Sequence, residues 1–401
     1  MIVAKIFLTK GDKKMSKLLI KNGMVHDAIH PEAYAADILV EDGKIVAIAA
    51  GLEAEGVETV DATGLQVYPG FVEAHCHLGL DGYGIGFEGS DYNEMNDILT
   101  PHLNAIDGIN PMDPSVYQAA KGGVTTVCTG PGSANVLGGY FVAMKTAGKR
   151  IENMIVKEKV AMKCAFGENP KRCYRSVNNS SRMSTAAKLR EMLAKANEYM
   201  LKKEAAGDDV TKRPAFDMKL EALIPVLKKE IPLKAHAHQA NDIFTAIRIA
   251  KEFDVKMTLE HVTEGHLVVE ELCQEPYPVA VGPSLTHASK FELQNKTFTT
   301  PGILAAAGMQ VSIITDSSVI PQQYLPLCAG LAVKAGMDPF AALQAITINA
   351  AKHIGIEDRV GSLEVGKDAD IVLANGDPMV SDTCIMATYI NGALAATGEE
   401  E

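Results

Sequence analysis

A chain of 401 residues, 47% hydrophobic and 22% charged, has an ordinary globular composition and is long enough for one large barrel with an accessory module. Its formal net charge of −12 argues against a nucleic-acid or anionic-membrane partner. No apolar run reaches the roughly 18 residues that a membrane span needs. The seven cysteines are scattered and form no C-x-x-C pair, which indicates free thiols in a reducing, cytoplasmic compartment.

The two ends of the chain are predicted to be rich in β-structure. After a predicted extension over residues 1–14, residues 18–67 read as short strands with turn signals at Asn22-Gly23 and Asp42-Gly43. The C-terminal residues repeat this style. Because either end alone would bury little apolar surface, we expect one small β-sandwich built from both. The predicted domains are residues 15–68 and 361–401 for the sandwich and residues 69–360 for the middle.

The middle of the chain alternates short apolar strands with helical stretches, the pattern of parallel β/α units. About eight such units over roughly 290 residues predict a (β/α)8 TIM-type barrel, hence an α/β fold class. The clearest strands after the first are residues 123–127, 159–166, 231–236, 255–261, 278–282 and 310–316, and the clearest helices are 184–203, 241–253, 300–307 and 339–354. We place the third strand at 159–166 and expect a weak fourth strand within 213–223.

Polar residues stand where the predicted strands end. His75 and His77 share one face of the first strand, because side chains at i and i+2 point the same way. The other residues that end strands or follow them directly are Glu168, His236, His238, His261 and Asp316. Imidazoles and carboxylates that converge at one mouth of a barrel suit zinc or another borderline divalent metal.

Four segments make the chain resemble the metal-dependent amidohydrolase superfamily, close to its imidazolonepropionase-like and N-acetylglucosamine-6-phosphate deacetylase-like branches. They are residues 69–77 (PGFVEAHCH), 259–261 (LEH), 314–317 (ITDS), and 349–356 with 361–372. The resemblance implies that His75, His77, His236 and His261 are metal ligands and that Asp316 is both ligand and general base. His238 competes with His236 on the same strand face, and we prefer His236 as ligand and His238 as a substrate contact.

Many relatives bridge two metals with a carbamylated lysine late in the fourth strand, and the sequence shows no clear counterpart. Glu168 is the preferred replacement and Lys163 its rival, because Lys163 lies in the middle of its predicted strand. If neither residue reaches the metal, the site holds a single ion. Zinc is the expected cofactor, as one or two ions, with manganese, iron or cobalt as alternatives.

The predicted chemistry is hydrolysis of a C–N bond in a cyclic amide, an N-acyl compound or a peptide-like amide. A divalent metal lowers the pKa of a bound water toward ~7. Asp316 would take the proton of that water as it attacks a carbonyl carbon and would pass it to the leaving nitrogen. Deamination of an amino-substituted ring and a non-enzymatic scaffold on the same fold are the alternatives.

Further residues are candidates for binding a small-molecule substrate. Lys171 and Arg172 could bind a carboxylate or phosphate, and His287 follows the seventh strand. We also expect a homo-oligomer. The substrate itself cannot be read from the sequence, because in a barrel it is selected by the loops that follow the strands.

Overall fold

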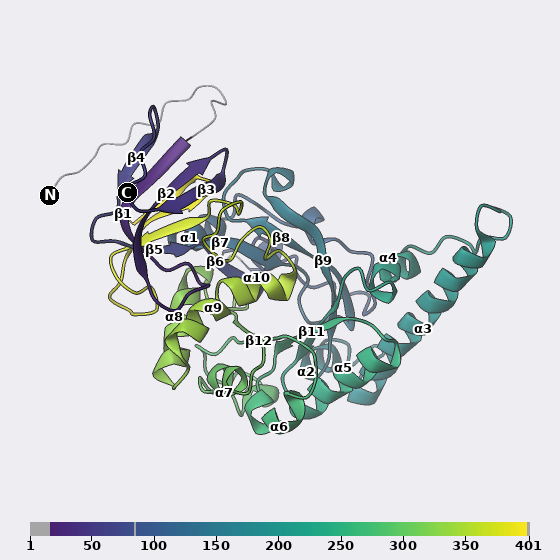
Figure 1. Ribbon diagram of the computed structural model, residues 1–401. Coiled ribbons are helices and arrows are strands. Elements are labelled where there is room, and N and C mark those ends of the chain that lie inside the picture. Colours follow the sequence, from purple (N-terminus) through teal and green to yellow (C-terminus); the bar gives the residue numbers. More distant parts are fainter. Residues whose placement is uncertain (1–16, 84–85, 399–401) are drawn as a thin grey trace.

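The computed structural model describes residues 17–83 and 86–398, so the extension predicted over residues 1–14 lies outside the described part. Two eight-stranded sheets organise the chain. In Figure 1 the purple N-terminal strands and the yellow C-terminal strands lie together beside the barrel, and helix α3 (Arg182–Ala206) projects from the opposite side. The predicted fold class, an α/β barrel with a smaller β unit, is confirmed.

The barrel sheet has the order β13-β12-β11-β10-β9-β8-β7-β6. Its strands are β6 (Phe71–Cys76), β7 (Val124–Thr129), β8 (Leu137–Lys145), β9 (Ile155–Ala165), β10 (Leu233–Ala237), β11 (Met257–His261), β12 (Val279–Val281) and β13 (Val311–Ile313). All neighbouring pairs are parallel except those of β8, which runs antiparallel to both β7 and β9. Strict β/α alternation therefore holds only outside the β7–β9 region.

Strand β8 corrects the predicted strand order. Gly138-Gly139 interrupts the apolar run of this strand and so resembles a turn in the sequence. In the structure Gly139 lies within the strand with φ +118°, and another part of the chain passes very close to it. A Cβ on Gly139 would lie 2.4 Å from the carbonyl oxygen of Leu103, in the long loop after β6. Strand β9 is consequently the fourth strand of the sheet and not the third. The fourth strand expected within residues 213–223 is wrong, since helix α4 (Met218–Leu227) begins there.

The seam between β6 and β13 is held by side chains, since no strand ladder joins these two strands in the described part of the chain. Glu73 on β6 is fully buried, and its Oε2 accepts hydrogen bonds from the backbone N–H (2.9 Å) and the hydroxyl (2.6 Å) of Thr315. Gln322 donates to the same oxygen at 2.9 Å. This carboxylate ties the end of β13 to the first strand and so fixes the backbone next to Asp316.

The helices cover the outside of the barrel. Besides α3 and α4 they are α1 (Pro114–Lys121), α2 (Glu168–Cys173), α5 (Ala240–Glu252), α6 (Val269–Leu272), α7 (Thr300–Ala306), α8 (Leu325–Lys334), α9 (Pro339–Ala345) and α10 (Ile348–Ile354). Local signals set their ends: Asp113 and Asp338 cap α1 and α9, and Ser181 forms a capping box with Ser184 on α3. The single helix predicted over 339–354 is two helices, because Thr347 leaves the helical region with φ −134° and ψ −103°.

The second sheet joins the two ends of the chain. Its strands are β1 (Lys17–Val25), β2 (Tyr34–Glu41), β3 (Lys44–Ala49), β4 (Glu58–Asp61), β5 (Gln66–Pro69), β14 (Ile371–Ala374), β15 (Ile385–Ile390) and β16 (Ala393–Thr397). The N-terminal and C-terminal parts meet where β5 pairs with β14. The expected joint β unit is therefore present as one continuous sheet with a shared apolar core. The domain limits at 68/69 and 360/361 stay a prediction.

A buried ion cluster attaches this sheet to the barrel. Lys145 of β8 lies 3.0 Å from Asp368 and 2.7 Å from Asp370, both just before β14. Arg359 and Lys44 also contact Asp368, at 2.8 and 2.6 Å. Burial alone would raise the pKa of Asp368, but Arg359 and Lys145 outweigh it and lower that pKa to about 2. The carboxylate is thus ionised and fully paired.

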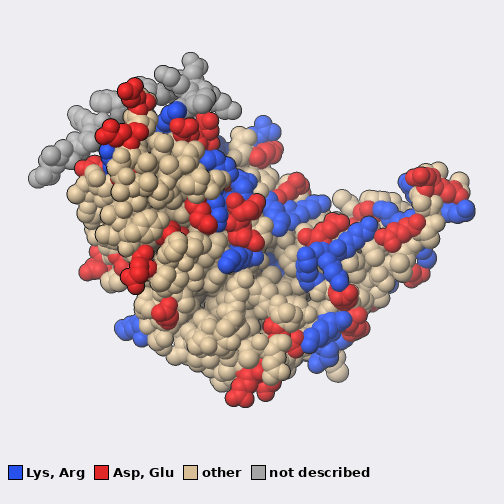
Figure 2. All heavy atoms as spheres, in the orientation of Figure 1, with Lys and Arg blue, Asp and Glu red and all other residues tan. Residues whose placement is uncertain are grey.

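One face of the molecule is mixed in charge. On the face shown in Figure 2, acidic and basic side chains are intermingled over the barrel and along the projecting helix. Within the described residues, no helix is both long enough and apolar enough to cross a bilayer.

Candidate metal and active site

The strand-end residues gather at one mouth of the barrel. His75 lies in β6 and His77 directly follows it, while His261 is the last residue of β11. His236 lies in β10, and Asp316 comes three residues after β13. These are the carboxyl ends of parallel strands, where barrel enzymes place their chemistry.

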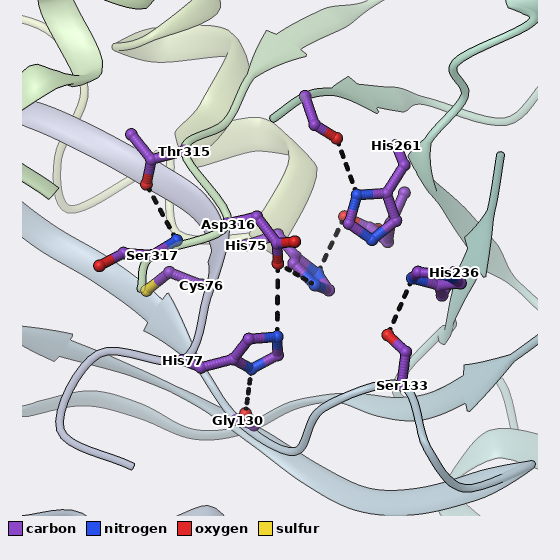
Figure 3. A network of polar contacts seen from close by, with 12 residues as sticks. His75, Cys76, His77, Gly130, Ser133, His236, His261, Thr315, Asp316 and Ser317 are labelled. Atoms are coloured by element: carbon purple, nitrogen blue, oxygen red, sulfur yellow. Dashed lines mark hydrogen bonds and ion pairs between the residues drawn. The ribbon is translucent and has the colours of Figure 1, made fainter. Parts of the chain in front are cut away.

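The first group consists of His75, His77 and Asp316, whose donor atoms all lie within 4.8 Å of one another. Asp316 Oδ1 lies 3.3 Å from His77 Nε2 and 3.6 Å from His75 Nε2 (Figure 3). Burial alone would raise the pKa of the Asp316 carboxyl, but the facing imidazoles of His261 and His77 hold it below its usual range. The carboxylate is therefore charged in the folded protein.

The second group consists of His236, His238 and His261, again with donor atoms within 4.8 Å. The rings of His236 and His238 lie 4.3 and 4.5 Å from that of His261, centre to centre. Burial lowers the pKa of all three imidazoles, to about 4 for His261, so each is neutral and has a free lone pair. His238, predicted as a substrate contact, stands in this group as closely as His236 does.

The Nδ1 atoms of four of these histidines are engaged away from the centre. Nδ1 of His77 and of His261 donates to the carbonyl oxygens of Gly130 and Gly282, each at 2.7 Å. Nδ1 of His236 pairs with the Ser133 hydroxyl at 2.8 Å, and that of His238 with the Thr263 hydroxyl at 2.7 Å. Such outer contacts fix ring orientation and leave Nε2 to act as a ligand.

His75 is oriented by a charge cluster inside the barrel. Its Nδ1 lies 3.3 Å from Glu260 Oε2, which also pairs with the Lys234 ammonium at 3.0 Å. His353 donates from Nε2 to Glu260 Oε1 at 2.9 Å. Burial alone would raise the pKa of Glu260, but Lys234 and His353 hold it well below the usual range. A buried carboxylate therefore stands behind the first histidine.

The structure places Lys163, and not Glu168, beside the first histidine. Lys163 is fully buried on β9, and its Nζ lies 3.3 Å from His75 Nε2. Burial lowers the pKa of Lys163 to about 8. Glu168 begins α2 beyond the strand end and belongs to neither group of donors found among the described residues. The sequence favoured Glu168 because Lys163 lies in the middle of its predicted strand. In the structure the strand of Lys163, β9, is the fourth of the sheet and not the third.

A cavity of about 350 Å3 opens beside both groups. His77, His236, His238 and Asp316 line it. So does Arg172, one of the expected substrate contacts. Among the residues that the structure describes, Lys171 and His287 do not reach the cavity wall, and His287 is exposed on its loop.

The donor set fits a divalent metal. Buried polar atoms in proteins almost always have a hydrogen-bond partner. Nε2 of His236, Nε2 of His261 and Oδ1 of Asp316 are buried without one among the described residues. Neutral imidazole nitrogens and carboxylate oxygens aimed at a common point are the ligands that zinc takes. The residues present could therefore hold the metal that the sequence predicted.

Sequence reasoning missed several residues around the site. Glu260 directly precedes the predicted ligand His261, but its side chain contacts a different histidine: its Oε2 lies 3.3 Å from Nδ1 of His75. Lys234 shares the strand face of His236 and reads as an isolated strand lysine. Glu292 lies in the short 3-10 helix η5 (Phe291–Leu293). It is eleven residues beyond the end of β12, too far for its position relative to a strand to mark it as a site residue.

Comparison with known proteins gives the family. The model of the amidohydrolase family matches residues 66–395, so the chain belongs to the amidohydrolase family. A solved amidohydrolase from Thermotoga maritima MSB8 is 40% identical and superposes with a TM-score of 0.92, covering 95% of this chain and 100% of that one.

Two curated relatives are more distant. The imidazolonepropionase of Geobacillus sp. is 27% identical over 404 residues, covering 90% of this chain and 86% of that protein. The amidohydrolase tasK of Hapsidospora irregularis is 27% identical over 390 residues, which is 90% of this chain. The chain spans only 40% of the length of tasK.

Proposed function

We propose that this chain is a metal-dependent hydrolase that cleaves a C–N bond of a small molecule, in a cyclic amide, an N-acyl compound or a peptide-like amide. The central observation is the convergence of Asp316 with two groups of buried imidazoles at the carboxyl ends of the barrel strands. The names of the relatives, an imidazolonepropionase and two amidohydrolases, support the same class.

The ligands in this proposal are His75, His77 and Asp316 on one side and His236 and His261 on the other, with Lys163 in place of Glu168 between them. Zinc is the first choice of metal, since the donors are mainly imidazole. When bound there, a divalent metal lowers the pKa of a water and polarises the scissile carbonyl.

The side chains of the protein perform the proton transfers. Asp316 is ionised and lines the cavity, so it can hold a water and accept its proton as the oxygen attacks the carbonyl carbon. The same carboxyl then donates that proton to the leaving nitrogen, which restores the carboxylate. His238 and Arg172 line the cavity and would contact the rest of the substrate.

A paired measurement tests the proposal. Purified protein is assayed for bound metal and then screened against cyclic amides, N-acyl amino acids, dipeptides and N-acetyl sugars, with product amines and ammonia quantified separately. We expect at least one tightly bound divalent ion and hydrolysis of one of these classes. Release of ammonia from an amino-substituted ring would replace amide hydrolysis by deamination. Less than half an equivalent of metal with no gain on adding zinc would contradict the proposal.

A further inference from the structure

Two cationic side chains line the cavity, and neither takes part in the proton transfers. Arg172 belongs to α2, and Lys290 directly precedes η5. Of the described residues that line the cavity, Asp316 is the only one with a carboxylate, and it belongs to the first donor group. The cavity therefore contains two positive charges that the donor groups do not require.

The ammonium group of Lys290 is fixed at the cavity wall. Its Nζ lies 2.6 Å from Oε1 of Glu292 and donates to the side-chain oxygen of Asn169 at 3.1 Å. Glu292 is fully buried, and its other oxygen, Oε2, accepts the backbone N–H of Glu168 at 2.8 Å. An ammonium has three hydrogens, so after these two contacts one donor of Lys290 is left for a ligand.

Asn169 links the two cations. Asn169 and Arg172 are three residues apart on α2, a spacing that puts two side chains on one face of a helix, and both line the cavity. Asn169 in turn accepts the hydrogen bond from Lys290. The loop before η5 and the face of α2 therefore present an ammonium and a guanidinium to the same cavity.

The guanidinium of Arg172 has no acidic partner within the described chain. The arginines that form ion pairs there are Arg150, Arg182, Arg190 and Arg359. Arg172 is exposed toward solvent, and its guanidinium has five N–H donors in a planar fork. Such a group is available to an anion that enters the cavity.

A cavity with these two cations favours a molecule that carries a negative charge. A guanidinium binds a carboxylate or a phosphate through two parallel N–H···O bonds, and a fixed ammonium adds another. Opposite charges attract more strongly in a partly enclosed cavity than in bulk water. The cavity volume of about 350 Å3 suits a small molecule, and the donor groups line the same space.

We propose that Arg172 and Lys290, the latter held by Glu292 and Asn169, together bind an anionic group of the substrate while its scissile C–N bond lies at the donor groups. That group is a carboxylate or a phosphate. The inference rests on the proposed function and narrows it to amides that carry an acidic group.

The test compares compounds that differ only in this charge. The acidic members are N-acyl amino acids, dipeptides, cyclic amides with a carboxylate and N-acetylglucosamine 6-phosphate, and each has a matched neutral amide, ring or sugar. The sugar pair separates a phosphate from a carboxylate as the group that is bound. We expect the acidic member of one pair to be hydrolysed with a kcat/KM about 100-fold higher than that of its neutral partner.

Variants then locate the preference. Arg172→Gln should raise KM for the acidic member by about tenfold or more, with kcat, metal content and KM for the neutral member close to those of the unaltered protein. Lys290→Met should do the same, but it also leaves the buried Glu292 carboxylate without its cation, which destabilises the fold. Arg172→Gln is therefore the decisive variant. Arg175→Gln, the same change at an exposed arginine just after α2, is the matched control and should alter nothing.

The contrary outcomes separate this inference from the proposed function. Equal kcat/KM for both members of every pair, or a preference that survives in Arg172→Gln, overturns the inference although the protein still hydrolyses an amide. If no compound is hydrolysed, the proposed function fails, and calorimetric binding of the same compounds decides the inference. Binding of an acidic member that Arg172→Gln weakens by about tenfold supports it. Absent binding, or equal binding of acidic and neutral members, overturns it.

Discussion

The two donor groups at the barrel mouth differ in charge. The group of His75, His77 and Asp316 contains an ionised carboxylate that lines the cavity, so it can accept a proton from a water there. The group of His236, His238 and His261 consists of neutral imidazoles. In the proposed mechanism, the first group would therefore carry out the proton transfers, and the second group would help to bind the metal that polarises the scissile carbonyl.

The largest expected effect separates catalysis from metal binding at the first group. Asp316→Asn keeps an oxygen donor but removes the base, so kcat should fall by about 10²–10⁴ while bound metal stays near the unaltered level. Turnover and metal content would be measured on the same preparation, with Asp382→Asn, an exposed change between β14 and β15, as the control. Normal turnover in Asp316→Asn would mean that Asp316 is not the base, and the two groups would then not differ in proton transfer.

The next comparison concerns the residue between the groups. Lys163→Met should lower both metal content and turnover, because Nζ lies 3.3 Å from His75 Nε2. Glu168→Gln should leave metal content unchanged, since its carboxylate belongs to neither group of the described residues. The metal content of the two variants would be measured with and without added bicarbonate, to test whether Lys163 binds metal as a carbamylated lysine. A loss in Glu168→Gln alone would restore the preference that the sequence suggested.

A smaller effect is expected from the carboxylate behind His75. Glu260→Gln should weaken metal at the first group by about 10–100-fold and leave the second group unaffected. The change also strands the buried charge of Lys234, which would destabilise the fold by about 3–5 kcal/mol.

The double variant Lys234→Met/Glu260→Gln removes that buried charge and separates the two effects. If Glu260 orients His75, the double variant recovers stability but not metal affinity. Recovery of both would mean that Glu260 acts only by pairing with Lys234.

The attachment of the terminal sheet gives the mildest prediction. The pKa of Asp368, lowered from 3.8 to about 2, makes the ionised form the stabilising one. Its contribution of about 2 kcal/mol is present above pH 4 and is lost as the pH falls toward 2. Asp368→Asn should therefore lower the free energy of unfolding near neutral pH, and the difference from the unaltered protein should shrink in acid. Glu152→Gln, at an exposed ion pair, is the control and should change little.

The residues that sequence reasoning found and those that it missed differ in where they lie. The residues that the sequence indicated stand at or just beyond the ends of apolar strands, where the two-residue period of a strand and the position of its end identify them. They are His75, His77, His236, His261 and Asp316. Lys163 was ranked below Glu168 because it lies in the middle of its strand, and because β8 was missed that strand was counted as the third and not the fourth. Glu292 reaches the site through a loop whose path depends on Gly167 and on tertiary packing, and no local pattern records that path.

Removal and return of the metal tests the central claim most directly. Protein stripped with a chelator would be titrated with zinc while hydrolysis of the best substrate from the screen is followed. The account predicts that turnover vanishes without metal and returns in proportion to the zinc that the histidine and Asp316 sites take up. Undiminished turnover in protein shown to be free of metal would contradict it.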